Sequence, residues 1–267
     1  MIRTSYQDLL TAIRATGVED GSVLMVHSDL PSLGVMEGGA TGVIEALLEA
    51  VGKSGTLVMP TFTFRFFNEE FNQGVPFDPQ NIRSETGIIS EEFRTHYPVH
   101  RTINPIHSVA AFGPKASEIV GHVSESSFGA ESPFGIMTEI NGINLMLGVD
   151  FQSGATFIHH VEEMEGVPYR YWKEFPGRVT DSKRTDNITY RMYVRDLNFD
   201  QDFNRIGDIL DEQGLVRTVH LGYGSLRAIN LVEGYRAVAE LISVDSMACA
   251  VSITSADPEL GWLGSES

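Results

Sequence analysis

Two short apolar segments separated by one helical pattern constrain the fold of this chain most. Residues 22–27 and 55–60 have the length and composition of buried strands, and residues 43–51 have helical periodicity and end at Gly52. A strand, a loop, a helix and a second strand in this order are typical of a parallel βαβ unit. We therefore expect an α/β fold that begins with this unit.

The rest of the chain continues the alternation. The same criteria predict helices at 5–16, 87–94, 115–120, 134–139, 203–212 and 230–241, and strands at 108–113, 143–149 and 216–221. Alternating residues at 174–179 and 188–194, on either side of a polar turn at 181–187, predict an added antiparallel hairpin near residues 170–200. Because no linker or repeat is evident, we expect a single domain over 1–255 with a flexible tail at 256–267.

Residues 61–84 break this pattern with a long aromatic and polar segment. Its aromatic residues are Phe62, Phe64, Phe66, Phe67, Phe71 and Phe77. A structureless segment of this length inside a compact domain is usually functional, often as a lid. We therefore expect it to border a site.

The charge balance excludes one class of partner. The chain has 19 Lys and Arg against 36 Asp and Glu, a formal net charge of -17. A nucleic-acid-binding protein needs a basic surface, so we expect no nucleic-acid partner. An acidic cleft would concentrate a cationic substrate, although solubility explains the acidity equally well.

The sequence also favours a cytoplasmic protein. No run approaches 18 apolar residues, which predicts no membrane span, and the first residues lack the apolar core of a signal peptide. Cys249 is the single cysteine, so a disulfide framework is excluded and a buried structural thiol is expected.

The most informative stretch for chemistry is residues 156–163, which follow a predicted strand. His159 and Glu162 are three residues apart and would meet on one face of a helix. A carboxylate can hold an imidazole neutral and oriented near pH 7, as a general base requires. The alternative interpretation is a group of solvated residues at the start of a helix. His27, His107 and His159 also fall where strands should end or loops begin, which is where α/β proteins place their sites.

Other chemistries find less support. A catalytic metal held by His159, His160, Glu162 and Glu163 is not expected, because no HExxH motif is present and adjacent helical residues point about 100° apart. A metal-dependent hydrolase nevertheless remains an alternative. Ser28 and Ser108 lack the G-x-S-x-G context of a hydrolase nucleophile.

Two glycines offer a weak signal for phosphate binding. Gly38 and Gly39 precede the helical pattern at 43–51, and free N–H groups at a helix N-terminus attract phosphates. Most helices that begin with glycine bind nothing, so this signal needs support from elsewhere.

Several collinear segments together resemble the aminoglycoside 3-N-acetyltransferase family. The matching segments are 26–30, 33–34, 38–39, 55–61, 77–79, 84–87, 92–94, 101–113, 128–134, 147–149 and 156–162. The resemblance extends from about residue 5 to 245 and is poor over 170–205. It implies an acetyl-CoA-dependent transferase with a three-layer α/β sandwich around a mainly parallel sheet.

The resemblance also implies roles for individual residues. The family motif threonine-x-leucine-histidine-x-alanine-glutamate matches Thr156, Ile158, His159, Val161 and Glu162, with His159 as catalytic base and Glu162 as its support. Ile158 and Val161 replace leucine and alanine but stay apolar. The residues expected to bind CoA are His27, Ser28, Leu33, Gly34, Gly38, Gly39 and Ser108.

The acceptor is less well defined. Asp78, Glu131 and Glu163 are expected to hold ammonium groups beside Thr156, and each is equally explained as a surface carboxylate. Ser108, Thr156 or a backbone N–H would donate to the thioester oxygen. The leading prediction is acetyl transfer from acetyl-CoA to an aminoglycoside amine. Acyl transfer to an amino sugar in biosynthesis and a non-enzymatic CoA-binding protein are the alternatives. The oligomeric state stays open, a homo-oligomer included.

Overall fold

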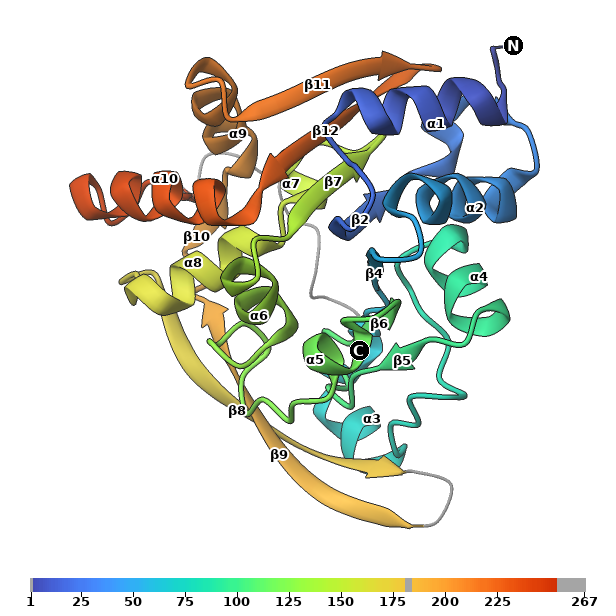
Figure 1. Cartoon of the computed structure of the whole chain (residues 1–267). Helices are drawn as coiled ribbons and strands as arrows, with labels where there is room; N and C mark the ends of the chain where they lie inside the picture. Colours follow the sequence, from blue (N-terminus) through green and yellow to red (C-terminus); the bar gives the residue numbers. More distant parts are fainter. Residues whose placement is uncertain (1, 181–183, 254–267) are drawn as a thin grey trace.

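A seven-stranded sheet forms the centre of the molecule in the computed structural model, which describes residues 2–180 and 184–253 (Figure 1). In spatial order its strands are β11 (Val216–Leu221), β12 (Gly224–Asn230), β7 (Ile143–Leu147), β2 (Val23–Ser28), β4 (Thr56–Pro60), β6 (Val109–Phe112) and β5 (His100–Arg101). The expected tail at 256–267 lies outside the described residues.

The parallel part of this sheet is confined to its centre. Strand β2 pairs in parallel with both β4 and β7, and α2 (Gly39–Val51) connects β2 to β4, as the βαβ pattern predicts. The other four pairings are antiparallel, so β6 and β12 run against the remaining five strands. The sheet is therefore mixed, although most of its strands share one direction.

Helices cover both faces of the sheet because side chains alternate along its buried strands. From β2, Leu24 and Val26 pack under α1 (Tyr6–Ala15), α2 and α4 (Ile88–His96). Val23 and Met25 point to the other face. That face is covered by α5 (Ala116–Val120), α6 (Pro133–Glu139), α7 (Phe151–Gly154), α8 (Phe157–Glu165), α9 (Phe203–Glu212) and α10 (Leu231–Val244). None of the described helices is long and apolar enough to cross a membrane.

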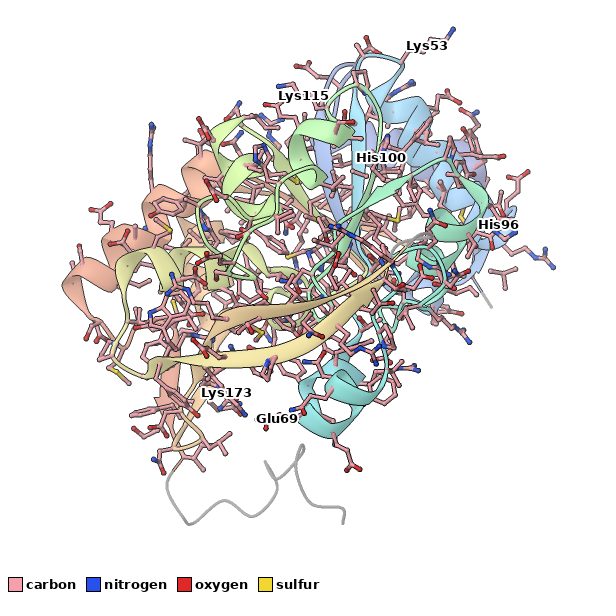
Figure 2. All side chains as sticks on the ribbon, turned by 90° about the horizontal axis from the view of Figure 1, so that it is seen from below. Lys53, Glu69, His96, His100, Lys115 and Lys173 are labelled. Atoms are coloured by element: carbon pink, nitrogen blue, oxygen red, sulfur yellow. The ribbon has the colours of Figure 1, made fainter. Side chains whose placement is uncertain are left out.

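A long hairpin stands beside this body and has a core of its own. Strands β8 (Arg170–Thr180) and β9 (Thr185–Arg195) pair antiparallel, longer than the alternation at 174–179 and 188–194 predicts. Phe175 and Tyr190 of the hairpin pack with Phe66 and Phe77. Lys173 also forms an ion pair with Glu69 of α3 (Glu69–Gly74), with 3.0 Å between Nζ and Oε1 (Figure 2).

The segment at 61–84 is therefore not a structureless lid. It contains the 3-10 helix η2 (Phe64–Phe67) and α3, and Phe66 and Phe77 are fully buried. These short helices could not be predicted from the sequence, because the clustered phenylalanines show no helical periodicity. Strand β12, which follows β11 through a turn at Gly222, was not expected from the sequence. The same holds for two small sheets, β1 (Arg3–Thr4) with β3 (Val35–Met36) and β10 (Phe199–Gln201) with β13 (Ala250–Ser252).

One buried guanidinium fastens the 61–84 segment to the sheet. Arg101 of β5 donates to the carbonyl oxygens of Thr61, Pro79 and Ile82, and its Nε also reaches the hydroxyls of Thr61 and Ser108. No carboxylate accepts directly from it in the described part of the chain. Neutral oxygens spread over two segments thus satisfy a single charged side chain.

Replacing this guanidinium should destabilise the fold. Arg101→Met removes the donor to the carbonyl oxygens of Thr61, Pro79 and Ile82, although the Thr61 oxygen keeps the Ser108 hydroxyl as a donor. The free energy of unfolding should therefore fall by about 3 kcal/mol. Urea titration followed by circular dichroism measures this difference, with the exposed Arg83→Met as the control. Equal midpoints for the two variants would show that Arg101 does not fasten the segment.

Candidate active site

Helix α8 brings the two residues of the predicted dyad together. Phe157, Ile158 and Val161 are buried against the core, which fixes the rotation of the helix. His159 and Glu162 then lie one turn apart, with 2.8 Å between His159 Nδ1 and Glu162 Oε2. The helical spacing proposed from the sequence is confirmed.

Two residues that the sequence analysis missed complete the environment of Glu162. The Tyr169 hydroxyl donates to Glu162 Oε1 at 2.7 Å, and Arg170 Nη2 lies 2.7 Å from Oε2. Both follow the cap of α8 at Gly166: Tyr169 lies just before β8, and Arg170 is its first residue. Helical periodicity could not predict these contacts, because both residues lie outside α8 and reach Glu162 only through the turn that follows the helix. A side chain with 0% exposure therefore keeps its charge paired and its oxygens occupied.

The charges around the dyad favour a neutral imidazole beside an ionised carboxylate. Burial lowers the pKa of His159, and the neighbouring Arg170 lowers it further, against the opposing effect of Glu162. Burial alone would raise the pKa of Glu162, but Arg170 and His159 hold it below its usual value. Arg170 Nη2 also lies 3.0 Å from His159 Nδ1. Because an ionised carboxylate can only accept a hydrogen bond, we infer that Nδ1 carries the proton and that Nε2 is the proton acceptor.

A pocket of about 350 Å³ opens at this imidazole. It brings together four of the predicted site residues, His27, Ser28, Thr156 and His159, although they come from distant parts of the chain. The remaining lining residues are Pro60, Phe62, Phe64, Thr86, His107, Val149 and Ser153. Burial lowers the pKa of His27 to about 4, and its buried Nε2 has no hydrogen-bond partner among the described residues.

Other residues expected to bind CoA lie away from this pocket. Leu33 is 1% exposed in the core, and a side chain at Gly34 would collide with the Ile2 carbonyl. Gly38 and Gly39 have positive φ at the start of α2. Contact of this loop with CoA stays a prediction. Ser108 was also expected to bind CoA, but it is 0% exposed, its hydroxyl donates to the Thr61 carbonyl at 2.7 Å, and it is absent from the pocket lining.

The three acidic residues assigned to the acceptor are also absent from the pocket lining. The Asp78 carboxylate accepts bonds from Asn81 within its own loop, and Glu131 is exposed. Glu163 accepts from the Ser126 hydroxyl at 2.6 Å, and burial raises its pKa. The structure therefore gives none of the three a direct position beside His159.

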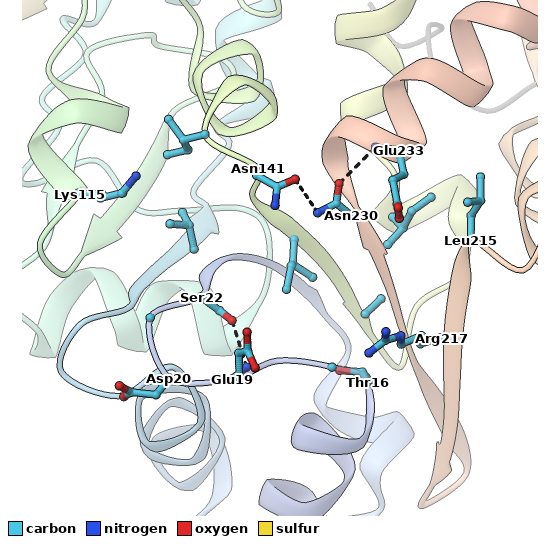
Figure 3. Close-up of a pocket in the computed structure, with 17 residues that line it drawn as sticks. Thr16, Glu19, Asp20, Ser22, Lys115, Asn141, Leu215, Arg217, Asn230 and Glu233 are labelled. Carbon is cyan, nitrogen blue, oxygen red and sulfur yellow. Dashed lines mark hydrogen bonds between the residues drawn. The ribbon is translucent and has the colours of Figure 1, made fainter.

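A wider groove of about 520 Å³ lies at the opposite end of the sheet (Figure 3). It includes Val23 at the start of β2, whereas His27 and Ser28 at the end of that strand line the pocket of the dyad. Its polar residues include Glu19, Arg217 and Glu233. No cluster of side chains that could hold a metal ion occurs among the described residues. The imidazole pocket has the chemistry of an active site because its wall includes His159, which is paired with the buried Glu162.

Known proteins resemble this chain along most of its length. The family model described as aminoglycoside 3-N-acetyltransferase matches residues 25–243. Aminoglycoside N(3)-acetyltransferase III of Pseudomonas aeruginosa is 28% identical over 225 residues, which cover 79% of this chain and 83% of that protein. The prophage-derived aminoglycoside N(3')-acetyltransferase-like protein YokD of Bacillus subtilis strain 168 is 28% identical, covering 85% and 88%.

Solved structures agree with the sequence relatives. The apoenzyme of aminoglycoside acetyltransferase AAC(3)-IVa superimposes with a TM-score of 0.75 at 26% identity, covering 93% of this chain and 92% of that one. The complex of AAC-IIIb with CoASH has a TM-score of 0.81 at 22% identity, covering 91% and 97%, and supports the fold. Because the family match spans most of the chain, this protein belongs to the aminoglycoside 3-N-acetyltransferase family of acyl-CoA-dependent transferases, which use acetyl-CoA.

Proposed function

We propose that this protein transfers the acetyl group of acetyl-CoA to an amino group of an aminoglycoside, with His159 as general base. The observation that carries the proposal is the 2.8 Å contact between His159 Nδ1 and the buried Glu162 carboxylate at the edge of a pocket. The relatives named as aminoglycoside acetyltransferases, and a variant of AAC(3)-IVa in complex with a gentamicin at 26% identity and a TM-score of 0.76, support the acceptor class.

The chemistry follows from the protonation states at the dyad. An ammonium group cannot attack a carbonyl, and each pKa unit above ambient pH costs the amine about 1.4 kcal/mol. Acetyl-CoA supplies the thioester, whose carbonyl carbon accepts the amine nitrogen and whose thiolate leaves. His159 Nε2 takes the proton from that nitrogen, and Glu162 stabilises the imidazolium that forms. The proton on His159 then neutralises the leaving sulfur, which restores the starting state.

Direct transfer of the acetyl group from acetyl-CoA to the amine in a ternary complex is consistent with the burial of the Cys249 thiol. Cys249 is 0% exposed, and burial with the neighbouring Glu162 raises the pKa of its thiol to about 12. A thiol in this state is a poor nucleophile. The neutral His27 and the Ser28 hydroxyl in the pocket are suited to hold the amide-containing arm of CoA. The route therefore requires no covalent acetyl-enzyme.

Removing the base should reduce turnover strongly. His159→Gln should lower kcat by about 10²–10⁴-fold, because the amine loses its proton acceptor, with smaller changes in KM. Glu162→Gln should also lower kcat, because the imidazole loses its negative partner. Steady-state assays with acetyl-CoA and gentamicin-type acceptors measure both. The exposed His96→Gln is the matched control (Figure 2). Unchanged kcat in His159→Gln would refute the assigned base.

The pH dependence follows from the sign of the His159 shift. A base acts when neutral, and burial and Arg170 lower the pKa of His159, so the acid limb of the kcat profile should lie below pH 6.5. Arg170→Gln removes the cation and should move this limb to higher pH, which separates titration of the base from titration of the acceptor amine. Identical limbs in the two enzymes would contradict the assignment.

The acceptor class has its own test. Purified enzyme should release CoA from acetyl-CoA in the presence of aminoglycosides, with the acetylated nitrogen identified by NMR spectroscopy. Simple monoamines at the same concentration serve as the control. Turnover of the monoamines at equal kcat/KM would contradict recognition of an aminoglycoside.

A further inference from the structure

His107 lines the same pocket as the base but has no role in the mechanism above. It lies just before Ser108 and the start of β6, and its side chain is 8% exposed. The pocket wall includes both His107 and His159. Phe128 contacts both rings, with centroid distances of 4.7 Å to His107 and 5.0 Å to His159. The two imidazoles therefore flank one aromatic ring and face one cavity.

The surroundings of His107 keep its ring in place and uncharged. Phe62 and Phe67 meet its ring edge-on, at centroid distances of 5.0 and 5.8 Å. Burial lowers the pKa of His107 to about 3, and the nearby His159 and Arg170 act in the same direction. A neutral imidazole has one N–H donor and one acceptor nitrogen.

The position of that proton follows from the partners of the two ring nitrogens. His107 Nδ1 is buried and has no hydrogen-bond partner within residues 2–180 and 184–253. A buried N–H without an acceptor is rarer in native proteins than an unpaired acceptor atom, so the proton belongs on Nε2. The backbone is fixed as well, because the His107 N–H donates to Asn104 Oδ1 at 2.8 Å. Because Nδ1 is buried in the pocket wall, Nε2–H is the donor of this ring that can reach a ligand.

The transfer reaction needs such a donor. Negative charge develops on the thioester oxygen as the amine attacks, and one hydrogen bond aimed at it is worth about 10²–10³-fold in kcat. Ser108 cannot provide it, because its hydroxyl already donates to Thr61. Thr156 lines the pocket and is the competing donor.

We propose that His107 is a catalytic residue whose Nε2–H donates a hydrogen bond to the thioester carbonyl oxygen, opposite the base His159. The inference rests on the proposed acetyl transfer. His107 keeps its proton throughout: the bond strengthens as the oxygen gains charge and weakens when the C–S bond breaks. Base and donor thus both line the pocket in which the reacting carbon would lie.

Two substitutions separate donation from packing. His107→Phe keeps an aromatic ring in the wall but removes the donor, so kcat should fall about 10²-fold, with the KM values within about threefold of wild type. His107→Gln restores an N–H group and should recover part of kcat. The acid limb of the pH profile should stay unchanged in both, because His107 does not titrate there. Thr156→Val tests the competing donor, and the exposed His122→Phe is the control.

A second readout requires no acceptor. Isotope-edited infrared spectra of bound acetyl-CoA, labelled with ¹³C at the thioester carbonyl, report hydrogen bonding at that carbonyl directly. The carbonyl stretch should lie at a lower frequency in wild type and His107→Gln than in His107→Phe. If wild type acetylates no amine, the proposed function fails, and this frequency difference alone decides the role of His107.

Several results would overturn the inference. The inference would be wrong if His107→Phe kept both the kcat and the carbonyl stretching frequency of wild type. A frequency change in Thr156→Val with none in His107→Phe would also overturn it. A fall in melting temperature that accounts for the lost activity would reassign His107 to packing. If His107→Phe does not fold, His107→Leu takes its place, with the same expected loss relative to His107→Gln.

Discussion

The site depends on one carboxylate that has no access to water. Glu162 is 0% exposed, and Arg170, Tyr169 and His159 occupy its two oxygens. An isolated buried charge would cost several kcal/mol, so these partners are a condition for placing an ionised acid here. Because Arg170 begins β8 while Glu162 belongs to α8, the same ion pair joins the helix to the base of the hairpin. The ion pair between Glu162 and Arg170 thus both helps to orient the base His159 and attaches the hairpin to α8.

The sheet explains where the site forms. The carboxyl ends of the adjacent parallel strands β2 and β7 meet at one edge. Ser28 at the end of β2 and Val149 just after β7 both line the pocket there. The groove that includes Val23 lies at the other ends of these strands and lacks a paired acid and base with a free nitrogen. The direction of the parallel strands therefore determines that the candidate active site lies at their carboxyl ends.

Sequence reasoning succeeded where the interactions are local. His159 and Glu162 are three residues apart, so helical periodicity alone predicts their contact. It failed for Arg170, because no periodic rule connects that residue to Glu162 across the turn at Gly166. The burial of Ser108 could not be foreseen either, because a motif gives no burial, and its hydroxyl donates to the Thr61 carbonyl just beyond the end of β4. The parallel centre followed from the strand, helix and strand pattern, whereas antiparallel β6 and β12 depend on pairings between distant segments.

The sealed position of Cys249 has a practical consequence. It is the single cysteine of the sequence, it has no exposed surface, and its raised pKa keeps it in the unreactive thiol form. Chromogenic disulfide reagents that label free sulfhydryls would therefore spare the folded enzyme while capturing each molecule of released CoA. Continuous optical monitoring of turnover is compatible with this protein, without a self-inactivation artefact from the detection chemistry.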